Sequence, residues 1–88
     1  MELTYHTDPG HGWLAVPRDV IDQLGVADKV SAYSYESNGM VCLEEDCDAG
    51  LLIEAMKARG IAYTIVERHT DADHWIRRLP AYRAQVSA

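Results

Sequence analysis

The stretch Val41-Cys42-Leu43-Glu44-Glu45-Asp46-Cys47-Asp48-Ala49-Gly50 places an apolar, strand-like run directly before four carboxylates. Apolar side chains at helical spacing follow as far as about Arg59, so this acidic segment opens into the longest helix that the sequence predicts. Asp46 or Asp48 is expected to cap that helix, because a carboxylate accepts hydrogen bonds from the free N–H groups of a first turn. The segment therefore joins a central strand to a central helix, and the remaining elements are expected to form around it.

Negative charge is concentrated in the middle of the chain. The formal net charge is -6, from 14 acidic and 8 basic side chains. Residues 30–56 contain no Lys or Arg, and their acids are Glu36, Glu44, Glu45, Asp46, Asp48 and Glu54. Glu44 and Glu45 are expected to be solvated. This charge disfavours direct binding to nucleic acid or to an anionic membrane, since both are polyanions, and it favours a basic protein partner.

Periodicity predicts one acidic α+β domain over residues 1–88. Alternation of apolar and polar side chains indicates strands, and apolar side chains three or four positions apart indicate helices. The expected strands are residues 2–6, 13–16, 30–35, 40–44 and 62–67, and the expected helices are about 17–24 and 46–59. The predicted order is β-β-α-β-β-α-β, in a mainly antiparallel sheet with its helices on one face.

Glycines mark the sharpest predicted changes of direction. Asn38-Gly39 lies between two strand-like runs and predicts a tight hairpin. Gly25 and Gly60 are expected to end the two helices, because glycine readily adopts the left-handed conformation found there. Residues 84–88 are small and polar and are expected to fray.

The C-terminal part combines aromatic residues with arginines. Thr70 or Asp71 is expected to cap a short helical turn that Pro80 ends. Trp75 and Leu79 are expected to pack on the sheet, since large aromatic side chains in a small domain mostly belong to the core. The arginines of this part are Arg68, Arg77, Arg78 and Arg83, and they would partly offset the acidic middle.

Neither cysteine is predicted to be a nucleophile or to form a disulfide. Cys42 and Cys47 are expected to be small buried thiols. The carboxylates around Cys47 should raise the pKa of its thiol by more than a helix N-terminus lowers it.

The sequence shows no apolar run of the roughly 18 residues that span a bilayer, and no signal-peptide pattern at its start. These features favour the cytoplasm of a bacterial cell.

Two groups of His and Asp residues are possible metal sites. They are His6, Asp8 and His11, and His69, Asp71, Asp73 and His74. Neither group has a recognised ligand spacing. The acidic stretch also departs from the calcium-loop template, because Ala49 and Ala55 stand where that template needs Gly and Glu. The sequence therefore predicts no metal, no cofactor and no catalytic residue, with a small metal-binding protein as a weaker alternative.

Four segments together are similar to a group of small proteins carried by bacteriophages and plasmids. They are Asp8-Pro9-Gly10-His11-Gly12-Trp13, Leu24-Gly25-Val26-Ala27-Asp28-Lys29, Tyr33-Ser34-Tyr35 and Leu43-Glu44-Glu45-Asp46-Cys47-Asp48-Ala49. The resemblance covers about residues 3–82. It implies an anti-CRISPR protein that inhibits an RNA-guided type I-C surveillance complex, and it supplies no catalytic residue.

The sequence and this resemblance lead to one hypothesis about function. RNA-guided effectors hold nucleic acid in a positively charged channel, and an acidic domain could occupy that site as a non-enzymatic inhibitor of target DNA binding. The expected partner-binding residues are Glu36, Glu44, Glu45, Asp46, Asp48, Glu54, Tyr33 and Tyr35, with Trp13 as a further aromatic anchor. A monomer is expected rather than a dimer. The alternative is an interaction module of a mobile element, built on the tyrosine-rich hairpin and the Trp75 region.

Overall fold

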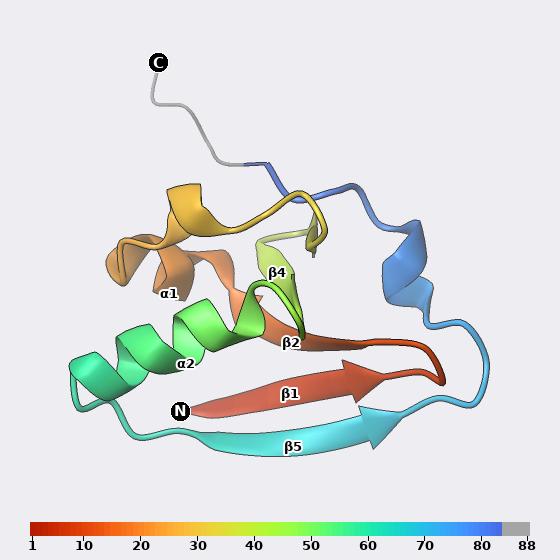
Figure 1. The fold of residues 1–88 in the computed structure, drawn as a ribbon, viewed down its shortest axis with the longest axis horizontal. Coiled ribbons are helices and arrows are strands. Elements are labelled where there is room, and N and C mark those ends of the chain that lie inside the picture. The colour runs from red at the N-terminus through yellow and green to blue at the C-terminus, as the bar shows by residue number, and fades with distance from the viewer. Residues whose placement is uncertain (84–88) are drawn as a thin grey trace.

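A computed structural model describes residues 1–83 as a five-stranded mixed sheet with two α-helices (Figure 1). In chain order the elements are β1 (Glu2–Thr7), β2 (Gly12–Pro17), α1 (Arg18–Gln23), the 3-10 helix η1 (Ala27–Lys29), β3 (Tyr35–Ser37), β4 (Met40–Glu44), α2 (Ala49–Ala58), β5 (Thr64–His69) and the 3-10 helix η2 (Trp75–Arg78). The fold is of the α+β class that the sequence predicts. The predicted fraying of residues 84–88 lies outside the described residues.

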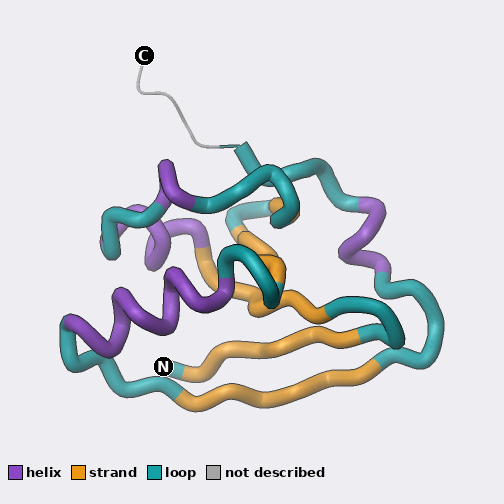
Figure 2. The backbone as a smooth tube through the Cα atoms, in the orientation of Figure 1, coloured by secondary structure: helices purple, strands orange, loops and turns teal. Residues whose placement is uncertain are grey.

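The strands lie in the order β3-β4-β2-β1-β5. β1 pairs with β2, β2 with β4, and β4 with β3, all antiparallel, whereas β5 pairs parallel to β1. The parallel pair follows from the connection, because α2 carries the chain from β4 across to the opposite edge of the sheet (Figure 2). The sheet is therefore mixed, with β3 and β5 at its two edges.

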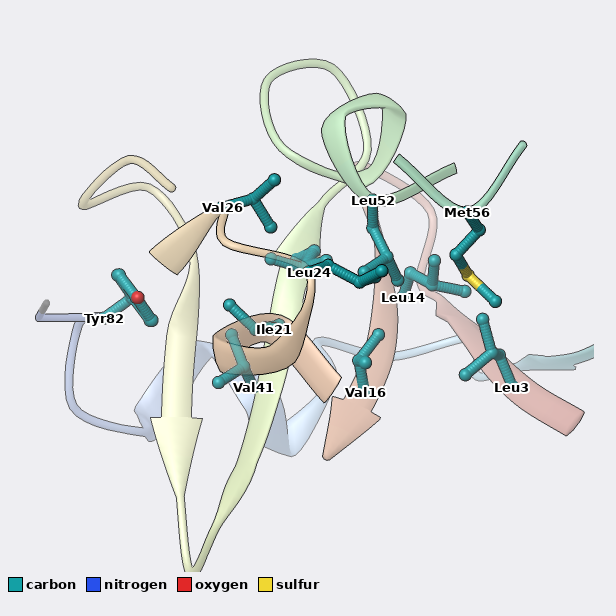
Figure 3. Close-up of a cluster of buried hydrophobic side chains, with 11 residues drawn as sticks. Leu3, Leu14, Val16, Ile21, Leu24, Val26, Val41, Leu52, Met56 and Tyr82 are labelled. Atoms are coloured by element: carbon teal, nitrogen blue, oxygen red, sulfur yellow. The ribbon is translucent and has the colours of Figure 1, made fainter. Parts of the chain in front are cut away.

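Both α-helices contribute to one hydrophobic core on one face of the sheet (Figure 3). Leu14 of β2 and Leu43 of β4 point to that face, where Ile21 of α1 and Leu52 of α2 cover them. All four of these side chains are buried. Each such burial contributes about 1.5–3 kcal/mol relative to exposure, so this core fixes both helices on the sheet.

The C-terminal segment covers the part of the opposite face formed by β2 and β4. Trp13 and Cys42 alternate with the residues of the main core and pack instead against Ile76 of η2. The His74 Nδ1 accepts a hydrogen bond from the Ile76 N–H at 3.1 Å, so His74 caps this turn and not Thr70 or Asp71. The expectation that Trp75 packs on the sheet is also wrong, because Trp75 is 54% exposed and Ile76 takes the buried position.

The hairpin between β3 and β4 turns at the predicted residues. Asn38 and Gly39 have φ angles of 51° and 80°, as a two-residue turn between twisted strands requires. The predicted strand over residues 30–35 is wrong, however, because β3 begins only at Tyr35. Residues 31–34 form a turn instead, which is held by hydrogen bonds to the carboxylate of Asp48.

Candidate partner-binding cleft

Asp48 is an internal structural acid. Its side chain is 2% exposed, and its carboxylate accepts hydrogen bonds from the Ser31 N–H at 3.0 Å, the Ser31 hydroxyl at 2.7 Å and the Ser34 hydroxyl at 2.5 Å. A buried carboxylate requires such partners. It makes no capping bond to α2, so the expected capping role is wrong. Asp48 instead ties the residue 31–34 turn to the start of α2.

Glu44 closes the neighbouring turn. Its carboxylate accepts the N–H groups of Asp46 and Cys47, both at 2.9 Å. The Ser34 hydroxyl accepts the Glu44 N–H at 2.9 Å while it donates to Asp48. Glu44 is also buried, so the expectation that it would be solvated is wrong. Ser34 connects the two acids, so the 31–34 turn and the 44–47 turn are held as one rigid unit.

A cleft of about 250 Å³ opens between these two turns and the sheet. Its lining residues are His11, Trp13, Tyr33, Tyr35, Glu44, Asp46, Cys47 and Arg77. Four of the predicted partner-binding residues are among them, together with the predicted anchor Trp13. His11, Cys47 and Arg77 were not predicted as part of this site. His11 could have been proposed from its place beside Trp13 in the Pro-Gly turn, whereas nothing in the sequence places Arg77 there.

Aromatic rings form much of the cleft. Trp13 is buried and meets Tyr35 edge-to-face, with ring centroids 6.4 Å apart. Within residues 1–83, the Trp13 indole Nε1 has no hydrogen-bond partner. Tyr33 lies at the rim and is 72% exposed, although its N–H is fixed by a hydrogen bond to the Ser31 hydroxyl at 3.2 Å. Tyr is among the residue types enriched at the hot spots of interfaces, so this ring is a candidate binding anchor.

The Asp8–Arg77 ion pair supports the cleft from behind. The Arg77 Nε and Nη2 donate to the two Asp8 oxygens at 2.6 and 2.9 Å, and the guanidinium lies over the Trp13 ring. The N–H groups of His74, Gly10 and His11 donate to the same carboxylate. Arg77 and these donors hold the pKa of Asp8 far below its usual range.

The same ion pair involves the acid of the first His/Asp group. Both Asp8 oxygens accept hydrogen bonds from Arg77 and from backbone N–H groups. In the part of the chain that the structure describes, no group of three His, Cys, Asp or Glu residues is arranged to hold a metal ion. The polar groups of the turn at residues 8–12 serve to position the cleft.

The net charge of the cleft is negative. Asp8 and Arg77 neutralise each other, whereas within residues 1–83 neither Glu44 nor Asp46 forms an ion pair with a Lys or Arg side chain; the His11 ring lies 3.8 Å from Glu44. Cys47 is exposed, which corrects the expectation of a buried thiol. A hydrogen bond to Glu44 and the neighbouring acids raise the pKa of this thiol, as the sequence predicts. The cleft is thus acidic and aromatic, with a protonated thiol at its side.

The other predicted acids lie outside the cleft. Glu36 forms an ion pair with Arg18 at 2.5 Å. Glu45 is exposed but accepts a hydrogen bond from the Tyr5 hydroxyl. Glu54 is exposed on α2 and borders a separate groove. The central acids are therefore divided between ion pairs, internal hydrogen bonds and the cleft.

Comparisons with known protein families, curated proteins and solved structures find no match to this chain. Across residues 1–83, no helix has the length and apolar character needed to cross a membrane. The resemblance to small mobile-element proteins therefore rests on the four sequence segments alone. Residues from three of those segments line the cleft: His11 and Trp13, then Tyr33 and Tyr35, then Glu44, Asp46 and Cys47.

Proposed function

We propose that this protein is a non-enzymatic inhibitor that binds a basic nucleic-acid-binding surface of a type I CRISPR surveillance complex and blocks target DNA binding. The observation that supports binding to a basic surface is the acidic, aromatic cleft built on two fixed turns. The choice of a CRISPR complex as the partner comes from the resemblance to mobile-element proteins. The proposal joins these two independent arguments.

The cleft suits the side chain of a Lys or Arg from the partner. Its volume of about 250 Å³ is below the roughly 300–1,000 Å³ of most small-molecule sites, and it leaves room for one inserted side chain. Asp46 and Glu44 would supply negative charge, and the rings of Tyr33 and Tyr35 would supply cation–π contacts. Because Asp48 and Glu44 already fix both turns, little conformational entropy would be lost on binding.

Capture of such a side chain would compete with DNA directly. Lys and Arg residues along the channel of an RNA-guided effector contact the nucleic-acid backbone. A residue held in the cleft is no longer available for that contact, and the net charge of -6 would also repel DNA from the occupied surface. The same charge would speed association at low salt.

The chemistry of the cleft supports an inhibitor that is not an enzyme. The raised pKa of Cys47 keeps its thiol protonated near neutral pH, and a thiolate is the form that reacts as a nucleophile. The lowered pKa of Asp8 and its pairing with Arg77 make this carboxylate a poor proton carrier. The groups that are available, Tyr33 and Asp46, are better suited to binding than to catalysis.

The test is target-DNA binding by a purified type I-C surveillance complex, with and without the protein. The double variant Tyr33→Ala/Asp46→Asn should raise the concentration needed for half inhibition by about tenfold or more, because an aromatic contact and a charge contact with the bound side chain are both lost. The matched control is Asp28→Asn, which neutralises an exposed acid away from the cleft and should inhibit like the wild type.

The other outcomes test separately the choice of the CRISPR complex as the partner and the choice of the cleft as the binding site. If the wild type neither inhibits nor associates with the complex, the CRISPR assignment is wrong, and the interaction-module alternative would replace it. If the wild type inhibits and the double variant inhibits equally well, the partner is correct but the cleft is not the binding site. If Asp28→Asn weakens inhibition as much as the double variant, total charge and not the cleft determines binding.

A further inference from the structure

The strand β5 forms an open edge of the sheet. All six of its residues are exposed, and β1 is the only strand beside it within residues 1–83 (Figures 1 and 2). Ile65 and Val66 are 48% and 37% exposed and point to opposite faces, since side chains alternate along a strand. β5 contains neither Pro nor Gly. Such an edge is a template for pairing with another strand.

The register with β1 shows which backbone groups of β5 are free. The Thr64 N–H donates to the Met1 carbonyl at 2.8 Å, and the Thr70 N–H donates to the Thr7 carbonyl at 2.9 Å. Backbone groups alternate sides along a strand, so the even-numbered residues of β5 face β1. The N–H and C=O groups of Ile65, Glu67 and His69 therefore point to the open edge.

We propose that β5 pairs antiparallel with β5 of a second copy of this chain, around a two-fold axis at Val66. A two-fold axis perpendicular to the sheet keeps each face on its own side, so the pairing must be centred on one residue. Centring on Glu67 would place two carboxylates opposite each other, and centring on Arg68 would do the same with two guanidinium groups. Like charges directly opposite each other are unfavourable.

The register centred on Val66 fits the backbone of the open edge. Val66 then lies opposite Val66 of the partner subunit in a close, non-hydrogen-bonded pair, which covers both exposed side chains. Ile65 lies opposite Glu67 of the partner subunit, and both residues have their backbone groups directed to the edge. This pair and its symmetry-related copy can each exchange two hydrogen bonds, so the sheet would continue without interruption across the axis.

Charge complementarity selects this register over one centred on Ile65. With Val66 at the axis, Arg68 of the partner subunit lies opposite Thr64, and Thr64 lies beside Glu2 on β1. A long Arg side chain can cross the small Thr64 to reach the Glu2 carboxylate, and symmetry provides the pair twice. Arg68 forms no ion pair within residues 1–83 and lies beside His6. The register centred on Ile65 would move Arg68 beyond the reach of Glu2.

The first test is mass against concentration by analytical ultracentrifugation. The wild type should rise from 9.8 kDa toward twice that mass. Val66→Lys should raise the dimer dissociation constant at least tenfold, because two ammonium groups would face each other at the axis. Met40→Lys is the matched control, since Met40 is an apolar residue of similar exposure, 39%, away from β5, and it should dimerise like the wild type.

A charge exchange tests the ion pair. Arg68→Glu should weaken the dimer, and the double variant Glu2→Arg/Arg68→Glu should restore it. The proposal is wrong if the wild type keeps a mass of 9.8 kDa up to ~1 mM, including the case in which this monomer binds an extended peptide instead. It is also wrong if Val66→Lys leaves the dimer unchanged.

Cysteine cross-linking tests the register. In a Cys47→Ser background, Val66→Cys should form a disulfide dimer under mild oxidation, because the Cα atoms of a non-hydrogen-bonded pair lie about 4.5 Å apart and disulfides span about 4.4–6.8 Å. Thr64→Cys and Glu67→Cys in the same background should form no disulfide-linked dimer, because neither residue lies opposite its own copy in this register. Faster cross-linking through Ile65→Cys or Glu67→Cys would overturn the register centred on Val66.

Discussion

The cleft and the β5 edge are two exposed surfaces of the same sheet, built in opposite ways. At the cleft, buried polar groups satisfy one another: Asp48 and Glu44 bind hydroxyl and N–H groups and hold Tyr33 in place. At β5, no side chain is buried and the outer backbone groups have no partner within residues 1–83. The first surface is suited to recognition by fixed side chains, and the second to recognition by the backbone.

The largest expected effect comes from removing the acid that holds the cleft. Asp48→Ala would leave the Ser31 N–H and the hydroxyls of Ser31 and Ser34 without their acceptor. Unsatisfied buried groups cost about 1–3 kcal/mol each, so the free energy of unfolding should fall by about 2–4 kcal/mol after partial relaxation. Urea denaturation followed by circular dichroism measures the change. Asp46→Asn, at an exposed acid two residues away, should stay within about 0.5 kcal/mol of the wild type.

A loss below about 1 kcal/mol for Asp48→Ala would show that the two turns do not depend on each other. The cleft would then not be held by the Asp48 hydrogen bonds, and it would not differ from the β5 edge in the way argued above. Thr64→Ala provides the comparison at the β5 edge. The Thr64 side chain is exposed, so this substitution should have little effect on the free energy of unfolding.

The second largest effect is expected from acid, which should lower the stability that the Asp8–Arg77 pair contributes beside the cleft. The folded-state pKa of Asp8 is lowered from its ordinary value of 3.8, so the folded state binds fewer protons than the unfolded state in this range. The stabilisation is therefore complete above pH 3.8 and is lost as pH falls toward the folded-state pKa. Thermal unfolding between pH 5 and pH 2 should show a steep fall for the wild type and a shallower one for Asp8→Asn. Equal slopes for the two proteins would contradict the role of the Asp8–Arg77 pair.

A weaker pH effect is expected near pH 6 from the His6–His74 pair. Burial lowers the pKa of both rings below 6.5, and their centroids are 4.9 Å apart. Stability from this pair is complete above 6.5 and is lost as pH falls below it, because the unfolded state then binds more protons. His74→Asn keeps an oxygen that can cap η2 but cannot titrate, so it should reduce the change in unfolding free energy between pH 7.5 and 5.5. His69→Asn, at an exposed ring, should keep the wild-type dependence.

Local chemistry allowed some of this structure to be predicted from sequence. Asn38-Gly39 and the glycines at positions 25 and 60 have the positive φ angles that their turns require, and these depend on neighbouring residues only. The alternation of Val41, Cys42 and Leu43 between the two faces is equally local.

Contacts between distant residues account for the errors. Asp48 is buried because Ser31 and Ser34, 17 and 14 positions earlier, bind its carboxylate. In the sequence, an Asp just before a helix has the pattern of a capping residue whether or not distant residues bind it. The parallel direction of β5 depends on the crossover by α2. Arg77 reaches the cleft through Asp8, 69 positions away. The sequence pattern therefore indicates the acidic stretch, but it does not predict which of the acids are buried and which are exposed.

A small effect on folding is expected at Tyr33, one of the two residues that the binding test changes. Tyr33 is 72% exposed, and the contact that fixes its position is made by its backbone N–H with Ser31. Tyr33→Ala should therefore change the free energy of unfolding by less than about 0.5 kcal/mol, while Ser31→Ala, which removes two hydrogen bonds of the turn, should cost more. Urea denaturation of the two variants side by side makes the comparison. If Tyr33→Ala destabilises the protein as much as Ser31→Ala, the ring is part of the fold and not a free anchor. If it does not, the turn holds Tyr33 in position without depending on it, as a surface fixed in advance for a partner requires.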